Sequence, residues 1–387
     1  MKHRMRTGLQ AVIVAALAQV ACGDTGDVAE GNQDAGAAEE LDEWDQRLEE
    51  REVDYGAALR IAALRLTGEL PTLAEIKAVA DAGDEPAQRT VYRALVKAYI
   101  DSPAFAVQMT RFWRDVLKIG GGAMDTPAVF AAQLTVEGRP YTEMFTATAG
   151  TCPTYDRETM VFTATDCASG APAHAGLLTH PAVMAQFFSN MAFRRVRWVQ
   201  ETFDCTAFPV EVGDPQDVGG AADYNGVWPF ESVASLETGG TIDFQDAKSV
   251  VCANCHQTMN HLAPLFANFD ADGNWQDAIS VPLPVDGAPP ARIEDWLVAG
   301  EQTAWRYGVP VADLTQLGQV MASDPRIAEC AVARVWNWAL GKQDIVDALT
   351  VVPSEVVAEQ VDAFVAGGHV LKDTIYSVFT SDDFVRF

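Results

Sequence analysis

The chain has 387 residues, of which 49% are hydrophobic and 9% aromatic, so it contains enough apolar material to build real cores. Its formal net charge is −27 at pH 7. This acidity argues against binding nucleic acid by general attraction, because phosphates would be repelled, and it favours basic proteins as partners.

The N-terminus is typical of an export signal. A basic head precedes an apolar run over residues 9–20 that is too short to span a bilayer as a stable helix. The run ends at Val20-Ala21-Cys22-Gly23, which resembles the lipobox of bacterial lipoproteins, whose Cys is acylated. We therefore expect residues 1–21 to be a signal peptide and Cys22 to anchor the protein to a membrane. The alternative is ordinary secretion by a cleaved signal.

An acidic tether follows the anchor. Residues 22–50 are rich in Asp, Glu, Ala and Gly and contain few large apolar side chains. Such a segment cannot bury enough surface to fold alone. It is expected to hold the folded part away from the membrane, at the cell envelope, facing the periplasm or the cell surface.

Residues 51–122 are predicted to form an N-terminal helical domain. Thr72 and Glu75 are spaced as a capping box, and Pro103 marks the first turn of a later helix. Apolar residues then repeat at helical spacing and are expected to face a core, namely Phe105, Met109, Phe112, Trp113 and Val116.

The next block, residues 123–240, is predicted to be a mostly irregular connecting region that contains a helix over 175–203. It carries three of the four cysteines other than Cys22, Cys252 and Cys255. Four thiols allow three pairings. Cys152 and Cys167 lie close together in a Thr/Pro/Asp-rich loop, so we expect them to pair, which leaves Cys205 for Cys330.

Residues 241–300 contain the most specific motif, Cys252-Ala253-Asn254-Cys255-His256. On a helix these spacings place both thiols and the imidazole on one side. The pattern predicts one covalently attached haem c, with thioether bonds from Cys252 and Cys255 and iron ligation by His256. Two alternatives are weaker: a zinc site completed by His261, and a redox disulfide.

Residues 301–387 are predicted to be a C-terminal helical region. Ser323-Asp324-Pro325 should begin a helix that Gly341 ends, and a last helix is expected from about Lys372 to Phe379. Strand signals are few. The predicted fold class is therefore mainly α, a multi-domain helical protein with a cytochrome c-like haem block and long irregular loops.

Several blocks resemble the planctomycete-type cytochrome c proteins, exported bacterial proteins largely of unknown function. The blocks include RLTGELPTLAEIKAV, AGLLTHPAVMA, RRVRWVQETFDC, CANCHQTMNHLAPLFANFDADGNW and DPRIAECAVARVWNWALGK. The chain departs from that group at Asn260-His261, where Asp-Pro is usual, and at Arg195-Val196, where Arg-Gly is usual. The resemblance implies export and haem binding more strongly than any reaction.

Three functions fit these observations: electron transfer at the cell envelope, a haem enzyme of the peroxidase or oxidase kind, and a surface binding protein with a structural haem. The second axial ligand of the iron would separate the first two, because an enzyme needs an open position. Met321 is the first candidate for that ligand. The upstream residues His180, Met184 and Met191, or an open site, are the alternatives.

Overall fold

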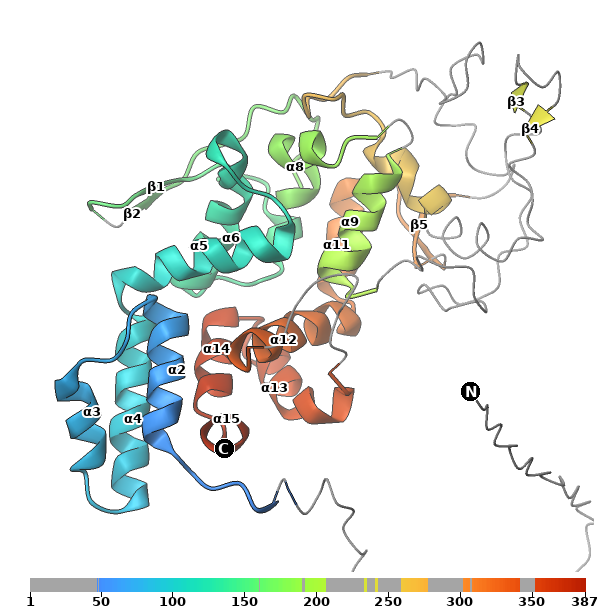
Figure 1. Cartoon of the computed structure of the whole chain (residues 1–387). Coiled ribbons are helices and arrows are strands. Elements are labelled where there is room, and N and C mark those ends of the chain that lie inside the picture. Colours follow the sequence, from blue (N-terminus) through green and yellow to red (C-terminus); the bar gives the residue numbers. More distant parts are fainter. Residues whose placement is uncertain are drawn as a thin grey trace, which may run out of the picture. The chain divides into compact units, whose positions relative to one another are not determined.

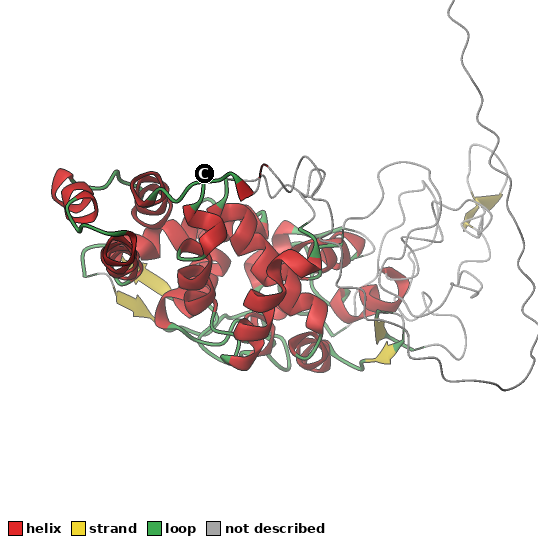
Figure 2. Ribbon diagram, turned by 90° about the horizontal axis from the view of Figure 1, so that it is seen from below, coloured by secondary structure: helices red, strands yellow, loops and turns green. Residues whose placement is uncertain are grey.

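The computed structural model describes residues 47, 49–159, 161–189, 192–206, 233–234, 241–242, 259–277, 302–306, 308–341 and 352–387. Of these residues 61% are helical and 6% are in strands, which confirms a mainly α fold (Figure 2). No helix within the described part combines the length and the apolarity needed to cross a bilayer.

Residues Arg51–Phe387 form one compact unit whose two ends pair with each other. Glu52 and Phe387 exchange two backbone hydrogen bonds, with N···O distances of 3.1 and 2.9 Å. The first helices and the last ones of this unit therefore contribute to one hydrophobic core. Figure 1 shows the corresponding neighbours: α2 packs on α4 and α5, and α4 also contacts α14.

Helices α2 to α5 begin and end where local chemistry dictates. Their bounds are α2 Tyr55–Thr67, α3 Leu73–Ala80, α4 Glu85–Ile100 and α5 Pro103–Leu117. The capping box of Thr72 and Glu75 is present at the start of α3, and Pro103 occupies the first turn of α5, both as predicted. The apolar stripe of α5 is buried throughout.

Part of the region predicted to be irregular is helical. It contains η1 Gly122–Asp125, α6 Thr126–Glu137 and α7 Glu143–Thr146. The prediction missed α6 because this helix lies against α5 and buries residues on nearly every side, so it shows no amphipathic repeat. Trp113 of α5 donates its indole N–H to Thr135 Oγ1 of α6 at 3.0 Å, which fixes the pair.

The predicted helix over 175–203 is interrupted. It consists of η2 Gly176–Thr179, α8 Pro181–Gln186 and α9 Phe193–Phe203. His180 adopts an extended conformation and caps α8, with Pro181 in the first turn. The backbone then reaches Ala192 at a φ of 54°, a left-handed conformation from which the chain enters α9 in a new direction.

The strands of the described part are short and form antiparallel pairs. They are β1 Thr154–Asp156 with β2 Val161–Thr163, β3 Val233–Ala234 with β4 Thr241–Ile242, and β5 Ala304–Trp305 with β6 Val309–Pro310. The register of the first pair matches Thr154 with Thr163. This hairpin lies between Cys152 and Cys167, so their cross-link closes its base.

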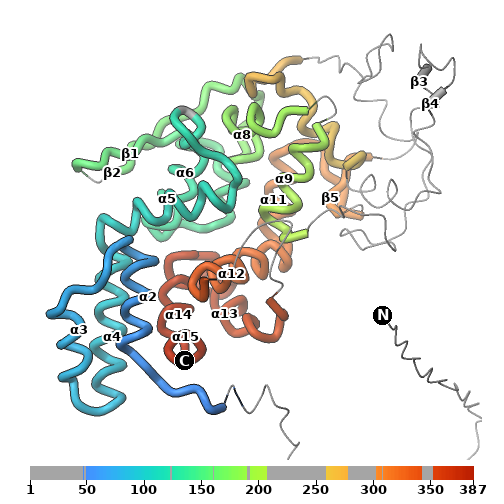
Figure 3. The backbone as a smooth tube through the Cα atoms, in the orientation of Figure 1, coloured from blue at the N-terminus to red at the C-terminus, as the bar shows by residue number. Residues whose placement is uncertain are grey.

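The C-terminal part is helical, as predicted. The two helices expected there, from Pro325 and from about Lys372, are present, and the other helices were not located from the sequence. It comprises α11 Leu314–Ala322, α12 Pro325–Ala339, α13 Ser354–Ala366, α14 Leu371–Phe379 and α15 Asp382–Val385. Asp324 caps α12, and its inner face is buried as expected. In the tube of Figure 3, α12 runs beside α13 and α14, and it also packs against α9.

Candidate functional site

The predicted haem ligands Cys252, Cys255 and His256 lie outside the described residues, as does the lipid candidate Cys22. The described chain resumes at Met259, three residues after His256. The structure therefore informs the haem hypothesis through the segment that directly follows the motif, residues 259–277.

This post-motif segment is well packed. Residues 259–266 are helical, and Leu262, Ala263 and Phe266 belong to the core. Asn260 and His261 are buried as well, with exposed fractions of 1% and 3%. His261, the alternative zinc ligand, thus lies among side chains of the core, and no metal-ligand cluster within the described part includes it.

Arg195 of α9 fixes this segment to the helical core. Its guanidinium is buried, with an exposed fraction of 1% for the residue. Nη1 donates to Phe266 O at 2.8 Å and to Phe269 O at 2.9 Å, while Nη2 donates to Asp270 O at 3.0 Å. Nε and Nη2 both donate to Met184 O, at 3.0 and 2.7 Å. One side chain therefore joins α8, α9 and the post-motif segment.

These five contacts use all five guanidinium donors, which explains how a cation is tolerated in the interior. The rings of Phe188 and Phe269 lie 5.4 and 5.9 Å from its Cζ and add cation–π contacts. Burial lowers the pKa of Arg195 to about 10, while Asp270 raises it, so the group stays charged at neutral pH. We expect its removal to leave several buried carbonyl groups without a donor.

A tight turn completes the segment. Asp270 Oδ1 accepts the backbone N–H groups of Asp272 and Asn274 at 3.0 and 2.9 Å, so these residues form a turn with local side-chain bonds. Gly273 has a φ of +80°, and a Cβ there would lie 2.0 Å from Pro181 O. Only glycine allows this turn to rest against the first residue of α8.

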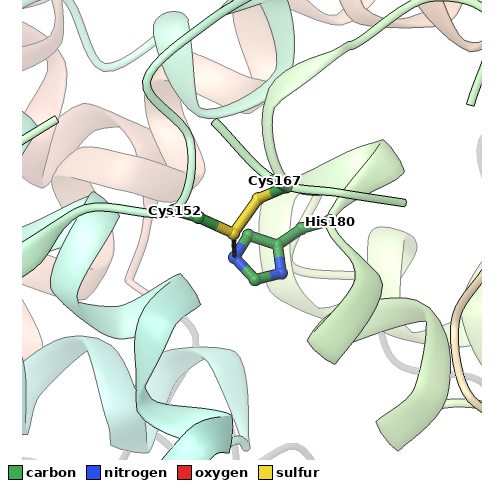
Figure 4. Close-up of side chains that lie close together, drawn as sticks. All are labelled: Cys152, Cys167 and His180. Carbon is green, nitrogen blue, oxygen red and sulfur yellow. Dashed lines mark hydrogen bonds between the residues drawn. A yellow bond between two sulfur atoms is a disulfide. The ribbon is translucent and has the colours of Figure 1, made fainter. Parts of the chain in front are cut away.

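A second cluster of chemically active side chains lies at the base of the β1–β2 hairpin (Figure 4). Cys152 and Cys167 are joined by a disulfide, the pairing expected from their spacing. His180 Nε2 lies 3.3 Å from Cys152 Sγ, and Thr151 donates its hydroxyl to Cys167 Sγ at 3.3 Å. The three groups have metal-ligand spacing, but the sulfurs are oxidised, so they form a cross-link rather than a ligand set.

Both ring nitrogens of His180 have partners. Nδ1 accepts the N–H of Ala182 at 3.2 Å, which leaves Nε2 as the nitrogen that carries the proton toward sulfur. Burial lowers the pKa of His180 to about 3, so the imidazole is neutral at every physiological pH. Both nitrogens of His180 are therefore engaged in this conformation, and its role as an axial ligand stays a prediction.

Three methionines were considered as the second iron ligand, and the structure describes two of them. Met321 lies in the last turn of α11, fully buried in the hydrophobic core, and Met184 of α8 is buried to the same degree. Met191 is outside the described residues. The axial role of Met321 stays a prediction, and its burial is explained by core packing.

The sequence did not single out the carbonyl-binding role of Arg195. The signal was present: Arg195 falls on the same helical face as Trp198 and Val199, which are buried, and a cation at such a position requires interior acceptors. The acceptors themselves lie 11 to 75 residues away, so local patterns do not identify them.

The fold and these contacts define a disulfide-linked helical protein in which α8, α9 and the post-motif segment form one connected block. Residues 174–279 match the family PSCyt3, a protein of unknown function (DUF1588), which is a domain family associated with planctomycete cytochrome c proteins. The match covers about a quarter of the chain and includes the Cys-x-x-Cys-His motif. Comparison with curated proteins and with solved structures gave no match.

Proposed function

We propose that the chain is an exported, lipid-anchored monohaem cytochrome that transfers electrons at the cell envelope. Cys252 and Cys255 would hold the haem covalently, and His256 would be an axial ligand of the iron. The observation that carries the proposal is the motif itself, within the segment that matches the cytochrome-associated family. When bound, the haem would supply a one-electron iron couple; the chain supplies its attachment and surroundings.

The donor set fits this group. Two thiols and an imidazole at this spacing are the groups that thioether attachment and iron ligation require. The post-motif segment supports the fit, because a chain that holds a redox centre should reorganise little when an electron moves. Arg195 and Gly273 fix that segment through buried backbone contacts. Both are positioning residues in this proposal.

The two disulfides support export. Cys152–Cys167 and Cys205–Cys330 account for all four cysteines outside the lipid and haem motifs. Disulfides persist in oxidising compartments, where c-type haem is also attached. Cys22 would then carry the lipid that anchors the chain. The net charge of −27 favours a basic protein as the redox partner.

Intact mass and visible spectra of the full chain, exported from a host with c-type haem maturation, test this proposal. We expect a mass increase of one haem that survives acid extraction, together with an acyl modification on Cys22. C252S/C255S should lose the haem, whereas the matched control C152A/C167A should retain it. A wild-type chain exported without haem would refute the cytochrome, and an unmodified, soluble chain would refute the anchor.

The state of the iron separates electron transfer from the haem-enzyme alternative. A carrier has both axial positions filled, so the reduced protein should not bind carbon monoxide rapidly. M321A should change the ferric spectrum and lower the reduction potential if Met321 is the second ligand. A high-spin ferric protein that binds carbon monoxide at once would favour an enzyme.

A further inference from the structure

We propose that a cationic pocket between α5, α9 and α12 binds the carboxylate of a small organic anion with an apolar or aromatic part. The pocket has a volume of about 210 Å³, and its main lining residues are Lys118, Phe187, Arg194, Arg197, Trp198 and Arg334. This inference goes beyond electron transfer and does not rest on the haem.

The described lining of the pocket is rich in cations. It contains four cationic side chains and one acidic residue, Glu201. Arg197 Nε lies 2.6 Å from Glu201 Oε1 in an i,i+4 pair, which neutralises part of the positive charge. A local excess of positive charge inside a chain of net charge −27 departs from the rest of the composition. Concave cationic sites concentrate anions.

The cations of the pocket lie at different depths. Arg334 of α12 has an exposed fraction of 4%, and its Nη2 donates to Glu201 O at 2.5 Å, which orients the guanidinium. Lys118 and Arg194 are exposed, and Arg197 exposes 44% of its side chain. A buried guanidinium together with exposed cations can attract an anion and then bind it in a drier environment.

The pocket lining also has an apolar part. The rings of Phe187 and Trp198 stack, with centroids 5.4 Å apart and an interplanar angle of 24°. Trp198 Nε1 donates to Leu117 O at 3.1 Å, so the indole is held in place. Aromatic side chains beside a few convergent polar groups are the usual composition of a small-molecule site. A ring or short alkyl group attached to the carboxylate would contact them.

Size and charge restrict the class of ligand. The volume suits a molecule of the size of an aromatic or short-chain acid, not a macromolecule. A polyanion such as nucleic acid would be repelled by the strongly acidic remainder of the chain. The guanidinium forks favour a planar carboxylate, which accepts two parallel N–H bonds.

Isothermal titration of the exported full chain at low ionic strength tests the pocket with benzoate as the probe. We expect saturable binding, at least about tenfold tighter than for benzamide, which has the same ring without the charge. R194Q/R197Q should weaken benzoate binding at least about tenfold. R93Q, an exposed arginine of α4 outside the pocket, is the matched control and should bind like the wild type. E201Q should strengthen binding because it removes the acidic residue among the described lining residues.

The carboxylate could belong to a free acid or to a haem propionate of the same chain, and the haem-free variant C252S/C255S separates these sources. Benzoate binding by both proteins indicates a free acid, and binding by the haem-free variant alone indicates a propionate. The proposal is refuted if neither protein binds benzoate, if benzamide binds equally well, or if R194Q/R197Q, with an unchanged circular dichroism spectrum, binds like the wild type.

Discussion

The two disulfides cross-link the chain in opposite ways. Cys152–Cys167 spans 15 residues and closes the base of one hairpin. Cys205–Cys330 spans 125 residues and joins the end of α9 to the middle of α12. The first bond acts locally, whereas the second connects the block that contains the post-motif segment to the C-terminal helices.

Their surroundings differ as much as their spans. The short disulfide has neutral neighbours, the hydroxyl of Thr151 and the neutral imidazole of His180. The long disulfide adjoins a charged network centred on Asp204, whose side chain is fully buried. Arg306 donates to Asp204 at 2.6 Å and also to Asp324, the cap of α12.

This network is stable only when complete. Burial raises the pKa of the Asp204 carboxyl, and the Thr206 hydroxyl and the guanidinium groups of Arg326 and Arg306 oppose that shift. A buried ion pair of this kind contributes little by itself, but removal of one partner leaves an isolated charge in the interior. We expect the long cross-link to keep α9 and α12 close enough for these charges to compensate one another.

The largest effect is therefore expected from C205A/C330A. In the chain-entropy model, closing a loop of 125 residues stabilises the folded state by about 5 kcal/mol. We expect the free energy of unfolding, measured by urea titration of the full chain, to fall by about that amount, with further loss if the Asp204 network loosens. A decrease of less than about 2 kcal/mol would show that the network holds α9 and α12 together without the bond.

C152A/C167A should have a smaller effect. A loop of 15 residues corresponds to about 3 kcal/mol in the same model. Since the cross-link closes a hairpin, we also expect the loss to be confined to it, with faster amide exchange in β1 and β2 and unchanged exchange in α9 and α12. Equal losses of stability in the two double variants would contradict the difference between a local and a long-range cross-link.

Much of the fold was predictable because its determinants are local. The capping box at Thr72, the helix start at Asp324 and the buried stripe of α5 each depend on residues within a few positions of one another. The disulfide pairs were predictable by spacing and elimination. Helix α6 was missed because burial on nearly all sides removes the periodic signal that identifies a surface helix.

The candidate sites were less predictable because their partners are distant in the chain. The acceptors of Arg195 lie on two segments up to 75 residues away, and Arg306 meets Asp204 across 102 residues. The cationic pocket combines residues from α5 to α12, which single-sequence patterns do not bring together. The Cys-x-x-Cys-His motif is the opposite case, since all its chemistry lies within five consecutive residues.

The smallest of the three expected effects is the loss of folding stability at acid pH that depends on His180. Its pKa is lowered to about 3 by burial in the folded protein, against an ordinary value of 6.5. Between these two values the unfolded chain binds a proton that the folded chain does not bind. This contribution to stability is therefore fully present above about pH 6.5 and is lost as the pH falls toward about 3, by at most about 1.4 kcal/mol per pH unit.

H180N isolates this contribution, because asparagine can still accept the N–H of Ala182 at the cap of α8 but does not titrate. Lowering the pH from about 7.5 to about 5 should cost the wild type about 2 kcal/mol more than H180N, measured by urea titration. Carboxylates and His369 titrate in both proteins, so their contributions cancel in the difference. Parallel pH profiles would mean that His180 is accessible to protons in the folded state, and that the short disulfide lacks the dry, neutral surroundings that distinguish it from the long one.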